Sequence, residues 1–201
     1  MDTRDRILEV GRGILLDSGL RALTTNEVAR RARISKKTLY RLFPTKRNLM
    51  EAVMISLVGD RLSTWDRILD DTSPIISRLH AAFVFVERFF PQLQANVLTS
   101  VAEIDPVLWK KIDRIRRERL GRLKDLLSEA QEAGYVTADI DADLWFLLLF
   151  TTIQHAITPK TLIEDGISLS EITLTTRKIY FDGLLTSAGR QALADISKEE
   201  Q

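Results

Sequence analysis

The sequence predicts an all-α protein in which a small three-helix unit precedes a larger helical body. Three observations lead to this prediction. Apolar residues recur at helical spacing almost throughout, little of the chain alternates as strands do, and the 9 Gly and 5 Pro are few and lie near expected breaks. We expect about nine helices, with one domain at residues 1–50 and the other at 51–201.

The first expected helix runs from about residue 3 to 18, with Asp2 or Thr3 as its cap and Gly19 as its stop. A short second helix follows, and the hydroxyl of Thr25 is suited to cap it. Gly11, on the apolar face of the first helix, is expected only to weaken that helix a little.

The third expected helix runs from Lys36 to Phe43, with Ser35 as its cap and Pro44 just after its end. A fourth begins near Lys46 and continues through "NLMEAVMISLVGDRL" into the body. The boundary between the two domains therefore lies in or beside a helix, without a flexible linker.

The body is expected to be helical almost to its end. Asp105 before Pro106 is typical of a helix start, and Gly134 and Pro159 mark helix ends. Residues 158–168 are expected to form a loop, and the polar residues 188–201 to fray. The expected helices are 74–90, 92–103, 106–133, 141–157 and 169–187.

Composition sets bounds on the class of protein. The chain is 45% hydrophobic and 28% charged, as is usual for a globular protein with a sizeable core. The absence of cysteine excludes disulfides and thiol nucleophiles. The amino terminus lacks a signal-peptide core, and the longest apolar run, "LWFLLLF", is too short to span a bilayer. We expect a cytoplasmic protein that does not enter the membrane.

Charge is unevenly distributed along the chain. Residues 1–50 hold 12 Lys and Arg against 5 Asp and Glu, a net charge of +7. The remainder holds 17 bases against 23 acids, a net charge of −6. This asymmetry suggests a polyanion-binding module carried by a mildly acidic body, although a solvated basic face would explain the charge alone equally well.

The three short amino-terminal helices have the proportions of a helix-turn-helix, whose last helix enters the major groove of DNA. Helix starts at Thr25 and Ser35 are suited to accept phosphates. Lys36 and Lys37 lie in the first turn of the third helix, where the helix dipole disfavours cations. An incoming anion reverses that penalty, so this local conflict indicates a binding site.

The stretch "ILEVGRGILLDSGLRALTTNEVARRARISKKTLYRLFPTKRNLMEAV", residues 7–53, resembles the tetracycline-repressor (TetR) family of bacterial transcriptional regulators. The resemblance rests on "TT", then "VA", then "IS..TLY..F..K..L" from Ile34 to Leu49. It covers about a quarter of the chain. It implies an all-α fold with a helix-turn-helix DNA-binding domain joined to a helical domain for ligand binding and dimerisation.

The resemblance also implies roles for individual residues. The third helix faces base edges, and Arg41 is suited to bidentate contact with guanine. Thr25, Tyr40 and Lys46 resemble phosphate contacts. The DNA-binding residues expected on this basis are Thr25, Asn26, Ser35, Lys36, Lys37, Thr38, Tyr40, Arg41 and Lys46.

Other cations nearby leave alternatives open. Arg30 and Arg31 are as consistent with solvated surface as with DNA contact, and Arg47 fits surface better. Arg33 stands where the family usually has glycine in the turn, and a left-handed conformation there costs a non-glycine residue about 1–2 kcal/mol. Either the turn differs, or a phosphate contact by Arg33 compensates.

For the body, the resemblance implies a homodimer built from the helices near 141–157 and 169–187. The first of these, "DADLWFLLLFTTIQHAI", is apolar nearly all round and must be covered on more than one side. Two recognition helices related by a two-fold axis would then read a palindromic operator. A monomer that buries the whole helix is the alternative.

The resemblance further implies a pocket for a small, largely apolar effector in the body. Taken singly, ordinary core packing explains each candidate lining residue better than ligand contact does. Gln154 and His155 are among the polar residues suited to orient a ligand. The candidates are Phe83, Phe90, Gln94, Leu98, Trp109, Trp145, Leu149, Gln154 and His155.

No cofactor or metal is expected, because the two histidines, at 80 and 155, lack ligand spacing. The basic run at 110–124 has acids interleaved, which is typical of a solvated helix face.

The function predicted from the sequence is that of a dimeric repressor that binds a palindromic operator and is released by an effector. The alternative keeps DNA binding, but the body recruits a protein partner. An enzyme is disfavoured, since no phosphate-binding glycine loop or nucleophile elbow is present.

Overall fold

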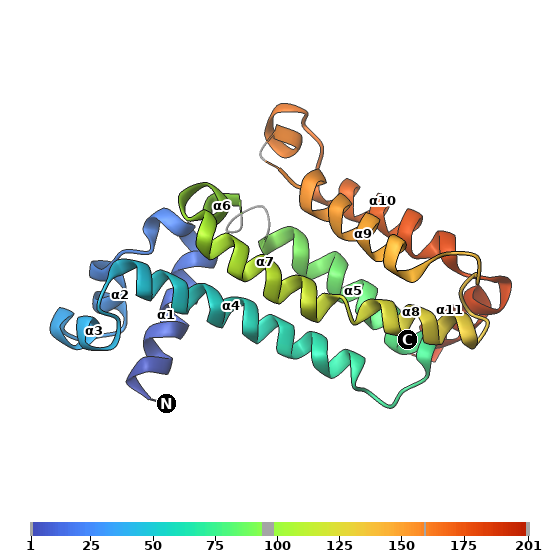
Figure 1. The fold of residues 1–201 in the computed structure, drawn as a ribbon, viewed down its shortest axis with the longest axis horizontal. Coiled ribbons are helices and arrows are strands. Elements are labelled where there is room, and N and C mark those ends of the chain that lie inside the picture. The colour runs from blue at the N-terminus through green and yellow to red at the C-terminus, as the bar shows by residue number, and fades with distance from the viewer. Residues whose placement is uncertain (1, 94–98, 159, 200–201) are drawn as a thin grey trace. The chain divides into compact units, whose positions relative to one another are not determined.

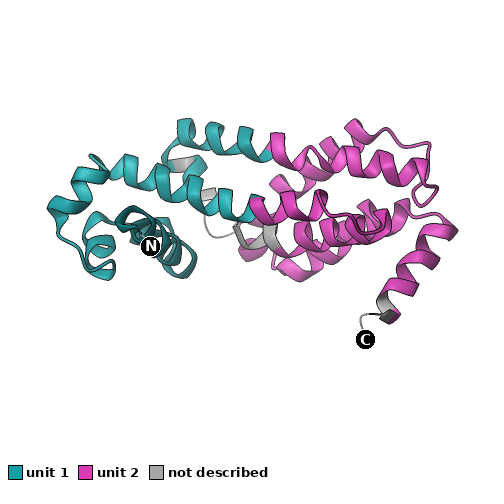
Figure 2. Ribbon diagram, turned by 90° about the horizontal axis from the view of Figure 1, so that it is seen from below, with its two compact units in different colours: residues 1–62, 96–116 teal, residues 63–95, 117–201 magenta. Residues whose placement is uncertain are grey.

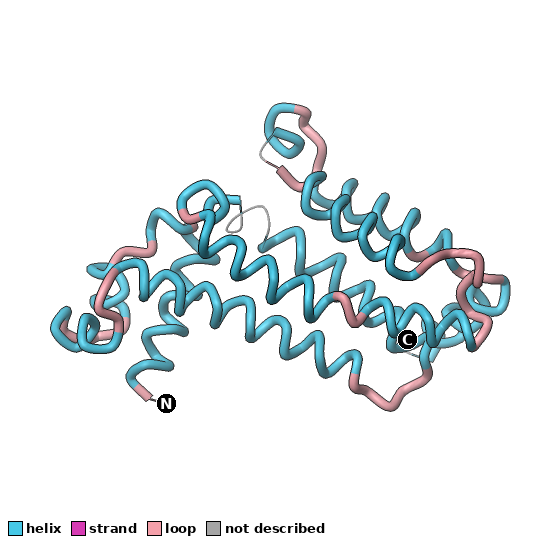
Figure 3. Tube along the Cα trace, viewed as in Figure 1, coloured by secondary structure: helices cyan, strands magenta, loops and turns pink. Residues whose placement is uncertain are grey.

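The computed structural model describes residues 2–93, 99–158 and 160–199, apart from the side chains of residues 89–93, 99, 100, 103, 197 and 199. The described residues are almost entirely helical and contain no β-strand, only an isolated bridge between Val136 and Leu185 (Figure 3). The all-α prediction is confirmed.

The helices keep the order that the sequence predicts, with differences in the body (Figure 1). Three-residue 3-10 turns lie at Leu20–Ala22 and Asp182–Leu184, and a π-helical turn lies at Lys160–Glu164, inside the expected loop. The α-helices are α1 Thr3–Ser18, α2 Thr25–Arg31, α3 Lys36–Leu42, α4 Lys46–Leu69, α5 Ile75–Leu93, α6 Thr99–Ile104, α7 Pro106–Leu120, α8 Leu123–Glu132, α9 Ala142–Ala156, α10 Leu169–Tyr180 and α11 Ser187–Glu199.

The chain forms two compact units (Figure 2). Unit 1 holds residues 1–62 and 96–116, and unit 2 holds residues 63–95 and 117–201. As predicted, α4 is continuous across the end of the amino-terminal unit. Unit 1 is larger than the expected domain at 1–50, because it also contains the next turns of α4, together with α6 and most of α7.

In unit 1, α1 is capped by Asp2 and stops at Gly19, whose φ is 75°, as the sequence predicts. Gly11 has a larger role than expected. A Cβ atom on Gly11 would lie 2.5 Å from Cγ2 of Val53, so the glycine permits the close approach of α1 to α4. The expectation that this glycine only weakens α1 a little is therefore wrong. A side chain at this position would clash with Val53, and this matters more than the backbone entropy of glycine.

The single helix expected at 106–133 is wrong, because it is interrupted between α7 and α8. Gly121 and Arg122 form a turn in which the Arg122 N–H donates to the carbonyl of Arg119, three residues back, at 3.4 Å. Glycine disfavours a helix interior by about 1 kcal/mol relative to alanine. The indole Nε1 of Trp65 donates to the same Arg119 carbonyl at 2.8 Å, which stabilises the break.

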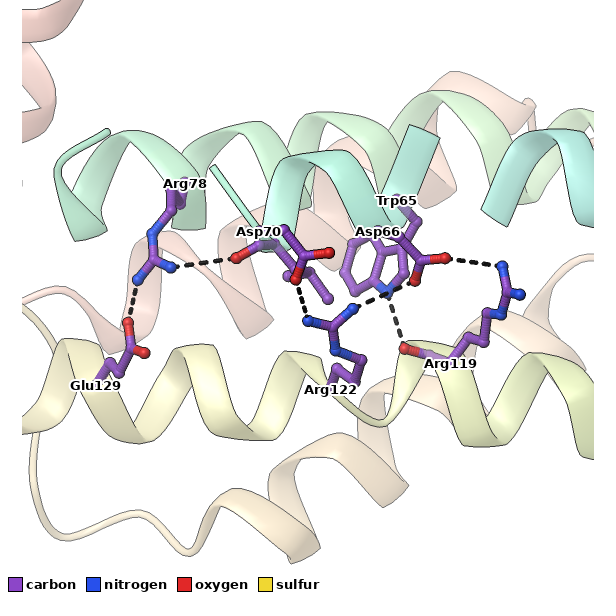
Figure 4. A network of polar contacts seen from close by, with 8 residues as sticks. Trp65, Asp66, Asp70, Arg78, Arg119, Arg122 and Glu129 are labelled. Atoms are coloured by element: carbon purple, nitrogen blue, oxygen red, sulfur yellow. Dashed lines mark hydrogen bonds and ion pairs between the residues drawn. The ribbon is translucent and has the colours of Figure 1, made fainter. Parts of the chain in front are cut away.

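Charged side chains surround this break in unit 2 (Figure 4). Arg119 donates to Asp66 at 2.8 Å, and Arg122 donates to Asp66 at 3.3 Å and to Asp70 at 2.5 Å. Beside them, Arg78 on α5 pairs with Glu129 on α8. The last turn of α4 is thus tied to both sides of the α7–α8 turn by ion pairs.

The carboxy-terminal part of unit 2 also differs from expectation. The helix predicted at 169–187 ends at Tyr180, and the segment expected to fray forms α11. The Thr186 hydroxyl donates to the carbonyl of Gly134 at 2.7 Å, and the Gly189 N–H donates to Thr186 at 3.1 Å. A Cβ on Gly189 would lie 2.1 Å from the Tyr135 carbonyl oxygen, so α11 packs against the segment after α8. Tertiary contact, which composition does not show, stabilises this helix.

Candidate nucleic-acid interface

The turn between α2 and α3 has the hydrogen bonds of a Schellman motif. The Ile34 N–H donates to the Ala29 carbonyl at 3.0 Å, and the Arg33 N–H donates to the Arg30 carbonyl at 3.2 Å. Arg33 has a φ of 53°, so it takes the left-handed conformation that glycine usually fills. The turn therefore does not differ from its usual geometry, and Arg33 takes a strained conformation in it.

Side-chain hydroxyls cap both helices of this motif. The Ser35 hydroxyl accepts a hydrogen bond from the Thr38 N–H at 3.0 Å, as predicted. In α2 the cap is Thr24, which accepts from the Glu27 N–H at 3.2 Å, so the assignment of this role to Thr25 is wrong by one residue. The two neighbouring threonines are equally suited by type, and only the backbone conformation distinguishes them.

Apolar side chains hold α3 against its neighbours. Leu39 is fully buried and Phe43 nearly so, and both come from the basic stretch itself. They pack in a core that also contains Val28 and Leu49 from α2 and α4. The guanidinium of Arg4 lies 5.6 Å from the Phe43 ring centroid. Burial of the apolar positions fixes which side of α3 faces outward.

The outward side of this motif carries unpaired cations. Lys36, Lys37, Arg41 and Lys46 are exposed. In the part of the chain that the structure describes, no carboxylate pairs with any of the four. The first turn of α3 holds no acid either, so the positive end of its helix dipole adds to the two lysines. The potential here favours an anion.

The neutral candidates lie beside these cations. The Thr25 hydroxyl and the Tyr40 hydroxyl are 3.4 Å apart, which brings the start of α2 next to α3. Thr38 is half-buried with its hydroxyl 3.0 Å from that of Ser35, and Asn26 is exposed. All nine residues predicted to contact DNA thus belong to α2, α3, the cap of α3 or the first turn of α4.

Three of the cations whose role the sequence left open, Arg30, Arg31 and Arg47, are paired with acids. Arg30 donates to Glu27 at 2.9 Å and 2.6 Å, and Arg31 donates to it at 2.6 Å. The hydrogen bonds from Arg30, then those from Arg31, lower the pKa of Glu27 to about 2. Arg47 makes two hydrogen bonds to Asp105, at 2.8 Å and 3.1 Å. These three guanidiniums are therefore neutralised within unit 1.

A cavity in unit 2 lies among α5, α9 and α10. Its volume is about 20 Å³, room for about one water molecule. Most of the wall is apolar, and Arg177 and Glu87 lie in it with 3.5 Å between Nη1 and Oε2. The wall is formed by Phe83, Val86, Glu87, Leu149, Ile153, Ile157, Ile172, Thr173, Thr176 and Arg177.

Of the nine residues predicted to bind a ligand, Phe83 and Leu149 lie in this wall. Trp145 packs on Phe83 with ring centroids 5.9 Å apart and donates to the Tyr180 carbonyl at 3.1 Å, as a core residue does. Gln154 accepts from Arg117 at 3.4 Å, His155 is exposed, and Trp109 belongs to unit 1. Phe90, Gln94 and Leu98 lie outside the described side chains.

The charged pair in the wall and the contribution of α10 were not predicted from the sequence. Arg177 and Glu87 are 90 residues apart, and no local pattern connects them. Ile172 and Thr176 are spaced by four residues on the helix assigned to dimerisation, which could have indicated a face toward the cavity. Sequence spacing does not tell which of two partners a helix face meets.

A second apolar surface lies on the outer faces of α9 and α10. Leu147 and Leu148 are each 50% exposed, and Leu144, Leu174 and Ile179 are exposed as well. Large exposed apolar residues gathered on two neighbouring helices are typical of an interaction surface. We refer to these five residues as the α9–α10 face.

The described residues offer neither a metal cluster nor a membrane span. None of their histidine, aspartate and glutamate side chains gather in a group of three that could hold a metal ion. None of the described helices is long and apolar enough to cross a bilayer.

Comparison with known proteins adds three findings. The family model of bacterial regulatory proteins of the tetR family matches residues 7–53. An uncharacterized HTH-type transcriptional regulator of Mycobacterium tuberculosis is 27% identical over 184 residues, which are 86% of this chain and 91% of the relative. The HTH-type transcriptional repressor KstR2 of M. tuberculosis is 23% identical over 153 residues, 74% of this chain and 76% of that protein.

The fold is also similar to that of a solved regulator. The transcriptional regulator FadR of Bacillus subtilis, crystallised in complex with stearoyl-CoA, superposes with a TM-score of 0.63 at 15% identity. The superposition covers 90% of this chain and 99% of FadR. At this identity the likeness concerns the fold, and it extends over the body as well as the helix-turn-helix.

Proposed function

Because the chain belongs to the TetR family of bacterial regulatory proteins and is a DNA-binding transcriptional regulator, we propose that it is a dimeric repressor. In this proposal it binds a palindromic operator in the bacterial cytoplasm and leaves it when a small, largely apolar effector binds the body. The observation that carries the DNA-binding part is the set of exposed cations on α3 and α4 without acidic partners among the described residues.

The proposed contacts divide by residue type. Arg41 and the two lysines of α3 face base edges, where an arginine can make two hydrogen bonds to guanine. Thr25, Tyr40 and Lys46 bind phosphates and set the orientation of α3 in the groove. Ser35 contributes through the cap that keeps the first turn of α3 in place. Asn26, exposed beside Thr25, is a base or backbone contact, and Thr38 helps to fix α3 against the DNA backbone.

The α9–α10 face supports the proposal of a dimer. Burial of five large apolar side chains against the same five of a second copy gives a closed, two-fold interface. We expect Leu148→Glu to produce monomers in sedimentation analysis. Leu16→Glu changes an exposed leucine of α1 instead and is expected to leave the dimer intact. A monomeric parent protein, or a dimeric Leu148→Glu variant, would contradict this interface.

The position of the cavity supports the proposal that an effector binds the body. It lies between α5 and the two helices that carry the α9–α10 face. Ligand pockets usually measure about 300–1,000 Å³, so an effector must widen the cavity by moving α9 or α10. An effector that prefers the widened conformation would change the spacing of two recognition helices and lower operator affinity.

The small volume of the cavity is also what favours the alternative function. A cavity of about 20 Å³ among α5, α9 and α10 is compatible with a regulator that recruits a protein partner and takes no effector there. FadR was crystallised with stearoyl-CoA and KstR2 is a ketosteroid regulator by name, so an acyl-CoA and a ketosteroid are sensible first probes. Release of operator DNA by either would favour the effector; thermal unfolding unchanged by either would favour the alternative.

The operator is tested by selecting bound duplexes from a random pool at a stated salt concentration, because affinity for DNA depends strongly on salt. The proposal predicts enrichment of a palindrome with two half-sites about one helical turn apart, or a multiple of it. Enrichment of no palindrome, with binding limited to a salt-dependent affinity for any duplex, would count against operator recognition by a dimer.

A further inference from the structure

Two ion pairs connect the first turns of α4 with the start of α7 inside unit 1. Arg47 donates through Nε and Nη2 to the two oxygens of Asp105, at 2.8 Å and 3.1 Å. One helical turn further along α4, Glu51 accepts from Lys111 at 2.6 Å. The partners in these two pairs, which we call the α4–α7 clamp, lie 58 and 60 residues apart in sequence.

Asp105 is the most constrained member of the clamp. Its side chain is 12% exposed, whereas that of Arg47 is 59% exposed. Its Oδ1 also accepts the Leu108 N–H at 3.0 Å, which caps α7. The backbone hydrogen bond from Leu108 and then the one from Arg47 lower the pKa of Asp105. A carboxylate held in place by its own helix gives Arg47 a fixed docking point.

The two pairs have opposite polarity. On α4 the base comes first and the acid one turn later, while on the α7 side the acid Asp105 comes before the base Lys111. Sliding one helix along the other would bring like charges together, so the alternation specifies one register. The clamp therefore fixes the first turn of α4 along α7 more narrowly than apolar packing alone would.

That first turn carries Lys46, the proposed phosphate contact next to Arg47 in sequence. Lys46 is exposed and without a carboxylate partner in the described residues, whereas the guanidinium of Arg47 donates two hydrogen bonds to one carboxylate. Two adjacent cations thus have different surroundings, in agreement with the sequence-based expectation, which placed Lys46 among the DNA contacts and Arg47 on the surface.

We propose that Asp105 is a positioning residue for DNA binding. By holding Arg47 it orients the first turn of α4 so that Lys46 meets a phosphate, and it keeps the charge of Arg47 away from the duplex. Glu51 and Lys111 support the same orientation one turn away. This inference rests on the proposed operator binding by α3 and α4.

Substitutions can separate positioning from direct contact, because removal of one phosphate contact makes the salt dependence shallower by about one unit. Asp105→Asn keeps a residue that caps helices well but removes the charge. Arg47→Gln removes the other partner. Both are expected to lower affinity for duplex DNA about threefold to tenfold with an unchanged salt slope, a modest reduction because exposed ion pairs are weak.

Lys46→Gln is the matched control, since it removes one cation from the neighbouring position. Its expected result is lower affinity together with a salt slope reduced by about one. The double variant Arg47→Gln with Asp105→Asn should bind no more weakly than either single variant, because both remove the same interaction. Lys111→Gln should lower affinity by about twofold to threefold, again with the slope unchanged, because it removes the more exposed pair of the clamp.

Several outcomes would overturn the proposal. A salt slope reduced by about one in Arg47→Gln would make Arg47 a phosphate contact. Tighter binding with a steeper slope in Asp105→Asn would make Asp105 an inhibitor of that contact. Unchanged affinity in both, with thermal unfolding as the check of folding, would make the pair merely structural. The slopes can be measured on any duplex, so this test remains valid even if the operator selection enriches no palindrome.

Discussion

Two basic stretches of this chain look alike in sequence but differ in how their charges are used. Residues 32–49 contain Lys36, Lys37, Arg41 and Lys46, together with Arg33 and Arg47, and residues 110–124 contain the cations of α7 and the start of α8. In the second stretch Lys111 pairs with Glu51, Arg122 with Asp66 and Asp70, and Lys124 with Asp143. In the first stretch Arg47 pairs with Asp105, whereas no described carboxylate pairs with Lys36, Lys37, Arg41 or Lys46.

The density of basic residues therefore does not identify a binding surface. A cation that already has a carboxylate partner must break that ion pair before it can bind a phosphate. An unpaired cation beside a helix start loses little by accepting one. From the sequence, the second stretch was expected to be a helix face with its own acids interleaved. Arg116 pairs with Asp113 inside the stretch, while Glu51, Asp66, Asp70 and Asp143 are partners from outside it.

The largest expected effect tests the unpaired cations directly. The triple variant Lys36→Gln, Lys37→Gln and Arg41→Gln should lower affinity for the operator about 100- to 1,000-fold, because it removes both base contacts and charge. Fluorescence anisotropy at a fixed salt concentration measures this. The matched control Arg119→Gln, Arg122→Gln and Lys124→Gln removes the same charge and should leave affinity within about twofold, since its cations are already paired. Equal reductions of DNA affinity in the two triple variants would contradict the proposed difference between unpaired and paired cations.

The next effect separates stability from binding within unit 1. Gly11→Ala places a methyl group 2.5 Å from Val53 and should lower the free energy of unfolding by about 1–3 kcal/mol. Gly13→Ala, on the same helix with nothing within 4 Å, should raise it by about 0.5–1 kcal/mol. Urea unfolding measures both. A stabilised Gly11→Ala variant would show that α1 moves away from α4 without cost.

The ion pairs of residues 110–124 should affect the stability of the fold instead of the affinity for DNA. Replacing both Asp66 and Asp70 by Asn removes the carboxylates that hold Arg119 and Arg122 and should cost about 1–2 kcal/mol in the free energy of unfolding. Thermal unfolding at low and high salt is the measurement, since salt weakens exposed ion pairs in the parent protein and leaves the variant less affected. A decrease in operator affinity at unchanged stability would contradict this division.

Arg33 tests an unpaired cation that is also strained. Arg33→Gly relieves the left-handed conformation but adds freedom to the unfolded chain, so we expect a gain of about 0.5–1 kcal/mol in stability. If a phosphate contact compensates for the strain, the variant also loses affinity, and its salt slope falls by about one. Greater stability with unchanged affinity would show that the arginine does not contact DNA.

The smallest effect on stability concerns Glu27, which forms ion pairs with Arg30 and Arg31 within unit 1. Its pKa is lowered from 4.5 to about 2 by Arg30 and Arg31, so its contribution to stability is complete above pH 4.5 and is lost as the pH falls toward 2. Titration followed by NMR measures the pKa. An ordinary pKa for Glu27 would show that the pairs are not populated.

Local chemistry made much of the fold and of the interface predictable. The cap at Ser35, the helix start at Asp105 and the stop at Gly134 depend on a few neighbouring residues, and all three occupy these positions. The Glu27 pairs with Arg30 and Arg31 are also local, at spacings of three and four, and could have been predicted from the sequence. Cap chemistry did not distinguish Thr24 from Thr25 because both have the required hydroxyl.

The remaining differences come from residues far apart in the chain. The α7–α8 break combines Gly121 with the indole of Trp65, 54 residues before Arg119. Helix α11 depends on contact with the segment after α8, and the cavity wall joins Glu87 to a helix residue 90 positions later. No window of sequence contains both partners of these contacts.

The all-α class, the helix-turn-helix and the side of α3 that faces outward could be predicted from the sequence, because helix caps and apolar spacing act over three or four residues. The pairs of Arg30 and Arg31 with Glu27 are local, but the neutralisation of Arg47 depends on the tertiary structure. Arg47 and Lys46 are adjacent and both basic, but a carboxylate 58 residues away binds one and leaves the other exposed. Which acid pairs with a base depends on the distance between them in space, and the packing of the helices sets that distance.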